Sequence, residues 1–92
     1  MKFDWDIDKN ESNYLKHGIT FEEGATVFDD NKAIYLPDDT HSNNEERFIV
    51  IGFSDRAKLL LVCHCYQNDD LVIRIISAIK TTKKEELEYE QQ

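Results

Sequence analysis

Apolar residues that favour β-strands are concentrated in runs in the second half of the chain, and this pattern predicts strands. Three segments have the pattern, and short polar stretches typical of turns separate them. They comprise residues 47–53, 58–66 and 71–77. Because consecutive strands joined by short turns usually pair with each other, we expect these segments to form an antiparallel sheet.

The first half of the chain has a helical pattern instead. Asp8 is followed three residues later by Glu11, which is the spacing of a helix-capping box. Gly18 suits the left-handed residue that often ends a helix, because it has no Cβ. These signals predict a helix from Asp8 to about His17.

A second start signal follows directly, because Thr20 and Glu23 repeat the capping spacing before an apolar face. This signal predicts a short helix over residues 21–28. A short strand is predicted for residues 32–36. It should end near Pro37, because proline cannot donate a hydrogen bond to a neighbouring strand. Residues 38–44 are polar, have no apolar period and predict a mobile loop.

The two ends of the chain complete the expected fold. Residues 2–5 alternate as a short first strand, and residues 80–91, rich in Lys and Glu, predict a terminal helix. An antiparallel sheet with two N-terminal helices and a C-terminal helix belongs to the α+β class. A length of 92 residues suits one hydrophobic core, so we expect a single domain over residues 1–92.

The composition narrows the class of protein. Hydrophobic residues make up 40% and charged residues 33% of the chain, as in small globular proteins. No apolar run approaches the roughly 20 residues of a membrane helix, and no apolar segment follows the N-terminal lysine, so we expect neither a membrane partner nor secretion. The two cysteines, Cys63 and Cys65, are too few for a disulfide framework, which indicates a cytoplasmic protein.

The formal net charge of −8 is unevenly distributed. Residues 1–45 carry four lysines against eleven acidic residues, whereas residues 46–84 carry seven basic residues against four acidic ones. An acidic protein as a whole repels nucleic acid, yet the basic zone of the second half could hold a phosphate. The alternative is that these lysines merely solvate an exposed helix, and composition alone favours it.

His64 and Arg74 interrupt otherwise apolar stretches in two consecutive predicted strands. If the register brings both to one face, a histidine that transfers protons near neutral pH would lie beside an arginine that holds a phosphate. Arg47, at the start of the preceding strand, could complete this cationic site. The alternative is an exposed histidine, with arginines that are paired with Glu46 or Asp70.

Cys63, His64 and Cys65 look like a metal-binding motif. In a strand, however, the two sulfur atoms point to one face and the imidazole to the other, so the three side chains cannot bind one ion. We therefore predict no metal and no cofactor, and we interpret both cysteines as buried structural residues. Motifs of serine-nucleophile and phosphate-loop enzymes do not occur, which leaves an RNA-directed site or a binding module.

Short motifs along nearly the whole chain resemble those of BrnT-type toxins. Their joint order and spacing, rather than any single motif, make the resemblance specific. In chain order they are Phe3-Asp4-Trp5-Asp6, Lys9, Asn13, Lys16-His17-Gly18, Phe21-Glu22-Glu23, Ala25-Thr26-Val27-Phe28-Asp29-Asp30, Asp39-Thr40-His41, Glu45-Glu46-Arg47, Gly52-Phe53-Ser54, Ile73-Arg74-Ile75-Ile76-Ser77-Ala78 and Tyr89.

The resemblance implies a toxin of a type II toxin–antitoxin system with a RelE-like fold, that is, a small endoribonuclease that cuts RNA without a metal ion and arrests growth. It also implies a BrnA-like antitoxin, a ribbon-helix-helix protein that covers the toxin and represses the operon together with it. Operator DNA would then be contacted only through the antitoxin. A dimer of the toxin within the complex is compatible with the resemblance.

For this chemistry the side chains divide into two predicted groups. The predicted catalytic residues, one acid or base and two phosphate stabilisers, are His64, Arg74 and Arg47. The predicted RNA-binding residues are Lys80, Lys16 and His17. The last two lie at the end of a helix, where the helix dipole alone can account for a basic pair.

One position departs from the family pattern. Family members usually carry an arginine directly after the Ile-Ser-Ala step, and this chain has Ile79 there. If that arginine binds the scissile phosphate, an isoleucine cannot replace it, and Lys80 would substitute only as a point charge. This departure, together with the acidic net charge, leaves a second interpretation open: a catalytically attenuated protein that binds the antitoxin as a corepressor.

Overall fold

A computed structural model describes residues 1–41 and 45–92 of the chain. Over these residues the α-helices are α1 (Ile7–His17), α2 (Phe21–Thr26) and α3 (Lys83–Glu90). Two short 3-10 helices accompany them, η1 (Val27–Asp29) and η2 (Asp39–His41). The strands are β1 (Lys2–Asp4), β2 (Ile34–Pro37), β3 (Phe48–Phe53), β4 (Leu59–Gln67) and β5 (Val72–Lys80).

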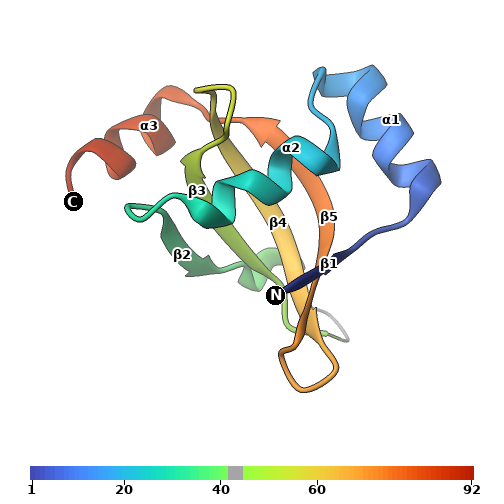
Figure 1. The fold of residues 1–92 in the computed structure, drawn as a ribbon. Coiled ribbons are helices and arrows are strands. Elements are labelled where there is room, and N and C mark those ends of the chain that lie inside the picture. Colours follow the sequence, from blue (N-terminus) through green and yellow to red (C-terminus); the bar gives the residue numbers. More distant parts are fainter. Residues whose placement is uncertain (42–44) are drawn as a thin grey trace.

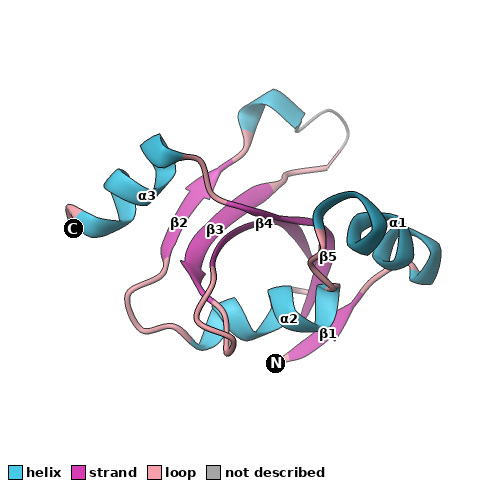
Figure 2. Ribbon diagram, turned by 90° about the horizontal axis from the view of Figure 1, so that it is seen from above, coloured by secondary structure: helices cyan, strands magenta, loops and turns pink. Residues whose placement is uncertain are grey.

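The strands form one curved sheet in the order β1-β5-β4-β3-β2. Figures 1 and 2 show that the sheet bends around α2, with α1 beside β5 and α3 at the opposite side. Neighbouring strands from β2 to β5 are antiparallel, as predicted, whereas β1 pairs in parallel with β5. The predicted antiparallel sheet is therefore confirmed from β2 to β5, and β1 adds one parallel strand at the edge, next to the last strand of the chain.

The two faces of the sheet have different roles. The face turned towards α2, here called the inner face, packs on that helix and on η1 to form the core. Buried apolar members of this core are Ile19, Phe21, Val27, Val50, Leu60, Val62, Ile73, Ile75 and Ala78. The register of the strands places on the opposite face, here called the outer face, Ile49, Ile51, Leu61, Cys63, Cys65, Arg74, Ser77 and Ile79.

A bulge between β4 and β5 decides which side chains share a face. On the hairpin side of the bulge His64 opposes Ile75, and beyond it Cys63 opposes Ser77, so the register shifts by one residue. Ile75 and Ser77 therefore point to opposite faces, although strict alternation puts them on one. Such a shift moves every following side chain of β5 to the other face.

The first helix begins earlier than its predicted cap. The Asp6 carboxylate accepts hydrogen bonds from the backbone N–H groups of Asp8, at 2.9 Å, and Lys9, at 3.1 Å. Asp6 is therefore the N-cap, and the prediction of Asp8 is wrong. The predicted end is confirmed, because Gly18 has a φ of 71° and its N–H donates to the Tyr14 carbonyl oxygen at 2.7 Å.

Three other boundaries differ from the sequence-based expectation. Thr20 caps α2 as predicted, but the α-helix tightens into η1 after Thr26. Strand β5 continues to Lys80, beyond its predicted end at residue 77, and α3 starts only at Lys83 behind a capping box formed by Thr82 and Glu85. The predicted loop 38–44 contains η2, and its residues 42–44 lie outside the described part of the chain.

The C-terminal helix contacts the sheet through Tyr89. The Tyr89 hydroxyl donates to Asp30 Oδ2 at 2.7 Å, and the Tyr89 ring packs on Phe53 with ring centroids 5.4 Å apart. Burial and the Asp30 carboxylate raise the pKa of Tyr89 to about 12. No described helix is long and apolar enough to span a membrane, and the longest, α1, has 11 residues.

Candidate functional site

His64 lies in the core, on the inner face, with none of its surface exposed. The ring centroids of Phe28, Tyr66 and Phe48 lie 4.8, 5.3 and 6.2 Å from that of the imidazole. Its Nδ1 is 3.1 Å from the Val62 carbonyl oxygen, and its Nε2 is 3.3 Å from the Tyr66 hydroxyl. Burial lowers the pKa of His64 below its ordinary 6.5, so the ring is neutral at pH 7.

Arg74 lies on the outer face, where it opposes Cys65. The predicted pair of His64 and Arg74 is therefore wrong, because the sheet separates the two side chains. Arg74 forms an ion pair with Asp4 of β1, which the parallel pairing of β1 places directly beside it. The Arg74 side chain remains 34% exposed, so its guanidinium group lies at the surface.

Arg47 lies directly before β3, and its Nε is 3.5 Å from Glu45 Oε1. Burial and Glu45 raise the pKa of the Cys65 thiol, while Arg74 and Arg47 counteract this rise. Both arginines thus lie close enough to Cys65 to act on it electrostatically. The two predicted phosphate stabilisers thus both lie near Cys65, Arg74 on the outer face and Arg47 directly before β3, each with a carboxylate nearby.

The predicted pair of Lys16 and His17 lies in a cleft between α1 and β5. Lys9 belongs to the same helical wall of this cleft, and Ile76 and Ser77 line its strand side. Because Ser77 points to the outer face, the cleft opens beside that face. The basic end of α1 and the outer face of β5 are thus neighbours.

Ile79 and Lys80 both belong to β5, but they point to different faces. Ile79 opposes Leu61 on the outer face and is half-buried, whereas Lys80 opposes Leu60 and is exposed. Lys80 is six strand residues from Arg74, which corresponds to about 20 Å. A phosphate held by Arg74 is therefore out of reach of Lys80.

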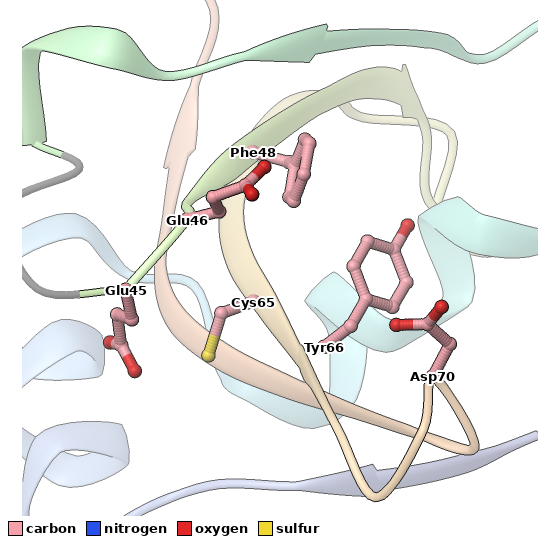
Figure 3. A pocket seen from close by; sticks show the side chains of 6 residues that line it. All are labelled: Glu45, Glu46, Phe48, Cys65, Tyr66 and Asp70. Carbon is pink, nitrogen blue, oxygen red and sulfur yellow. The ribbon is translucent and has the colours of Figure 1, made fainter.

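A cavity of about 520 Å³ lies where the hairpin of β4 and β5 begins (Figure 3). Its lining residues are Glu45, Glu46, Phe48, Cys65, Tyr66 and Asp70. Figure 3 shows Cys65 and Tyr66 pointing away from each other, so the cavity is at the strand end, where the two faces of the sheet meet. Its three carboxylates, Glu45, Glu46 and Asp70, oppose a phosphate inside the cavity itself.

The cysteines are placed as the strand pattern predicts, on the face opposite to His64. Cys63 Sγ lies 3.6 Å from Asp38 Oδ2, and burial together with this carboxylate raises the pKa of Cys63 to about 11. The thiol is therefore protonated at pH 7 and is a poor nucleophile. Within the described residues, no group of His, Cys, Asp and Glu side chains is arranged to hold a metal ion.

The sequence-based prediction missed two acidic residues that form ion pairs with the arginines. Asp4 and Glu45 were not recognised as partners of Arg74 and Arg47, for which Glu46 and Asp70 were the expected partners. The proximity of Glu45 to Arg47 in the sequence could have indicated one of these pairs. No sequence signal could have indicated the other, because Asp4 and Arg74 meet only through the parallel pairing of β1 with β5.

The fold is thus a small α+β domain in which Arg74 and Arg47 lie at one end of the sheet and the basic end of α1 lies beside β5. The family model described as the ribonuclease toxin BrnT of type II toxin–antitoxin systems matches residues 5–85. The chain therefore belongs to the BrnT family of ribonuclease toxins.

Comparison with solved structures agrees with this assignment. The crystal structure of the Brucella abortus ribonuclease toxin BrnT, at 1.1 Å resolution, is similar with a TM-score of 0.69 and 21% sequence identity. The similarity covers 90% of this chain and 99% of the Brucella chain. At this identity the comparison establishes the shared fold. A search of curated proteins found no match.

Proposed function

We propose that the chain is an endoribonuclease that cuts RNA without a metal ion, as one toxin domain formed by residues 1–92. In this reaction the ribose 2′-OH attacks the neighbouring phosphate, a base accepts its proton, and an acid protonates the departing 5′ oxygen. The products are a 2′,3′-cyclic phosphate and a 5′-OH end. The enzyme must also neutralise the charge that accumulates on the phosphate oxygens.

The position of Arg47 and Arg74 near Cys65 is the observation that carries the proposal. A guanidinium group can donate two parallel hydrogen bonds to a phosphate, and two such groups offset most of its charge. Their ion pairs with Glu45 and Asp4 are partly exposed. Exposed ion pairs contribute little free energy, so a phosphate can compete with these carboxylates.

Lys16 and His17 extend this cationic surface along β5, because their cleft opens beside the outer face. We propose that they contact the RNA on one side of the scissile bond, and that His17, which is exposed, is the histidine able to exchange a proton with it. His64 was predicted for this role from the sequence. Its complete burial means that it could take part only after the core had opened. Lys80 would contribute to RNA binding only through its long-range charge.

We further propose that the protein acts in the cytoplasm as a growth-inhibiting, RelE-like toxin with a BrnA-like ribbon-helix-helix antitoxin. Membership in a type II toxin–antitoxin family supports a protein partner of this kind. In this proposal the antitoxin neutralises the toxin, and the complex, which could contain a toxin dimer, represses its operon by contacting operator DNA through the antitoxin.

The proposal is tested by incubating antitoxin-free protein with a defined RNA in the presence of EDTA. We expect cleavage with 2′,3′-cyclic phosphate ends, and no cleavage by the Arg47→Ala/Arg74→Ala variant. Cleavage that EDTA abolishes would contradict the metal-independent mechanism. Absence of cleavage under all conditions would contradict the enzymatic function itself.

The second candidate function is a catalytically attenuated corepressor that binds the antitoxin. It is favoured by Ile79, which replaces the family arginine on the outer face, and by the carboxylate beside each arginine. Operator binding of the complex without RNA cleavage by the free protein would support this function. Controlled expression with and without the antitoxin, scored for growth arrest and RNA loss, separates the two candidates in the cell.

A further inference from the structure

The helix α1 carries its large apolar side chains on the side that faces away from the protein. Ile7, Tyr14 and Leu15 are 78%, 54% and 77% exposed. Ile7, Glu11 and Leu15 follow one another at intervals of four residues, and Tyr14 follows Glu11 by three, so these side chains form one stripe along the helix. We call these four residues the α1 stripe.

The inner side of α1 is polar and fixes the helix to the protein. Asn13 Nδ2 donates to the carbonyl oxygens of Ala78, at 2.7 Å, and Ile19, at 2.9 Å, and the Ala78 N–H donates to Asn13 Oδ1 at 3.1 Å. The N–H of Phe21 donates to Asn10 Oδ1 at 2.8 Å. The helix is thus held in place without any of the apolar residues of the stripe.

This arrangement inverts that of an ordinary surface helix, which buries its apolar side and exposes its polar side. These three side chains remain mostly exposed and are not part of the core, so they contribute little to folding. Figures 1 and 2 show α1 at the β5 side of the molecule, with β5 and α2 as its neighbours. An exposed apolar stripe on a rigidly held helix is typical of a surface that another protein covers.

We propose that the α1 stripe is a docking surface for the antitoxin, and that its occupant is a basic, apolar helix or segment of that protein. This inference rests on the proposed partnership with an antitoxin. The charge of the surroundings supports it, because Glu11 lies within the stripe, Asp8 borders it and the chain as a whole has a net charge of −8. A basic partner would be attracted by these charges and would bury the apolar residues.

A second copy of the chain fits the stripe less well. A symmetric contact between two copies would bring Glu11 of one close to acidic residues of the other, and both copies are strongly negative. Like charges that face each other across an interface oppose its formation. The two occupants also differ in stoichiometry, so that sedimentation of the free toxin distinguishes them.

The test is the affinity of the Ile7→Gln/Leu15→Gln variant for the antitoxin encoded beside the toxin gene. Glutamine is a good helix former, so the helix should persist and the thermal midpoint should stay unchanged. We expect binding to weaken by about 100-fold or more, as when central apolar anchors of an interface are lost. The matched control, Leu87→Gln, makes the same change at an exposed position of α3 and should bind like the wild type.

A charge variant provides a second measurement that leaves apolar packing untouched. Glu11→Lys should slow association with the antitoxin and weaken its dependence on salt concentration. If both stripe variants bind within threefold of the wild type, or if Leu87→Gln weakens binding equally, the proposal is overturned. A free wild-type dimer that Ile7→Gln/Leu15→Gln converts to monomers would also overturn it, since the stripe would then join two copies.

These outcomes are separate from those of the proposed RNA cleavage. The stripe variants should cut RNA like the wild type, because the stripe does not include any of the proposed RNA-contacting residues. Loss of antitoxin binding in variants of a protein that never cuts RNA would support the docking surface and contradict the proposed enzyme. Unchanged binding in variants of an active ribonuclease would contradict the docking surface alone.

Discussion

Arg74 and His64 lie on opposite faces of the sheet, although they belong to neighbouring strands and are only one register step apart. Arg74 opposes Cys65 on the outer face, and His64 opposes Ile75 in the core. The hairpin between β4 and β5 sets this register, and a shift by one residue would have placed both side chains on one face. The relationship divides the predicted site into a partly exposed residue, Arg74, and a fully buried one, His64.

Replacing Arg74 should affect catalysis more than stability. Arg74→Ala removes a guanidinium group from the proposed phosphate site, and loss of such a contact costs about 10²–10³-fold in rate. The free energy of unfolding should fall by less than about 1 kcal/mol, because the ion pair with Asp4 is partly exposed. Cleavage assays and urea denaturation measure the two effects.

Asp4→Asn is the matched control for this prediction, since it removes the same ion pair and keeps the arginine. Its cleavage rate should equal or exceed that of the wild type, because the phosphate no longer competes with a carboxylate. A folded and fully active Arg74→Ala variant would show that Arg74 does not take part in catalysis. A variant that does not fold would show that the role of Arg74 is structural.

The stability of the protein should depend on pH through His64. Burial lowers the pKa of this residue in the folded state, so below its ordinary value of 6.5 the unfolded chain binds a proton that the folded chain resists. The free energy of unfolding should therefore be highest above about pH 6.5 and decrease as the pH falls below it. In His64→Gln this contribution should be absent, as denaturation at pH 5, 6, 7 and 8 would show.

The same variant and His17→Gln decide which histidine transfers the proton. We expect the acidic or basic limb of the cleavage rate to persist in His64→Gln and to disappear in His17→Gln, with RNA binding retained. The opposite result would restore the sequence-based assignment of His64 and would require that the core opens during the reaction.

Ile79→Arg should raise the cleavage rate, because residue 79 points to the outer face on which Arg74 lies. The two positions are five strand residues apart, roughly 15 Å, so the introduced guanidinium would contact a different part of the RNA from Arg74. Ile79→Lys should raise the rate less, since an ammonium group lacks the planar fork.

Cleavage and thermal midpoint are measured together, because a charge introduced into this half-buried position can also destabilise the fold. If the cleavage rate and the thermal midpoint both stay unchanged, the interpretation that Ile79 attenuates the site is wrong.

Removing the Asn13 side chain should destabilise the protein strongly. Asn13→Ala leaves the N–H and C=O groups of Ala78 and the C=O group of Ile19 without their present partner. A buried group without a hydrogen-bond partner costs about 1–3 kcal/mol, so for three such groups we expect the free energy of unfolding to fall by about 3 kcal/mol or more. Ser12→Ala, an exposed change in the same helix, should cost less than about 0.5 kcal/mol. Equal stability of the two variants would contradict the anchoring role of Asn13.

The local signals of the sequence determined the elements and the class of the fold. Gly18 ends α1 and Thr20 starts α2 as predicted, since a cap depends on a few neighbouring residues. The runs of β-forming residues in the second half likewise predicted three paired strands, because short turn-like stretches separate them. The opposite orientation of His64 and its cysteine neighbours was predictable because side chains of a strand point to its two faces in turn.

Only the tertiary structure decided how these elements meet. Asp4 lies beside Arg74 because β1 pairs in parallel with β5, a contact between residues far apart in the sequence. The hairpin register and the bulge placed Arg74, Ser77 and Ile79 on the outer face. Periodicity within one strand defines two faces but does not say which face of the next strand matches them, because register depends on turn geometry and on packing across the whole sheet. The buried position of His64 and the solvent-facing stripe of α1 are consequences of that packing.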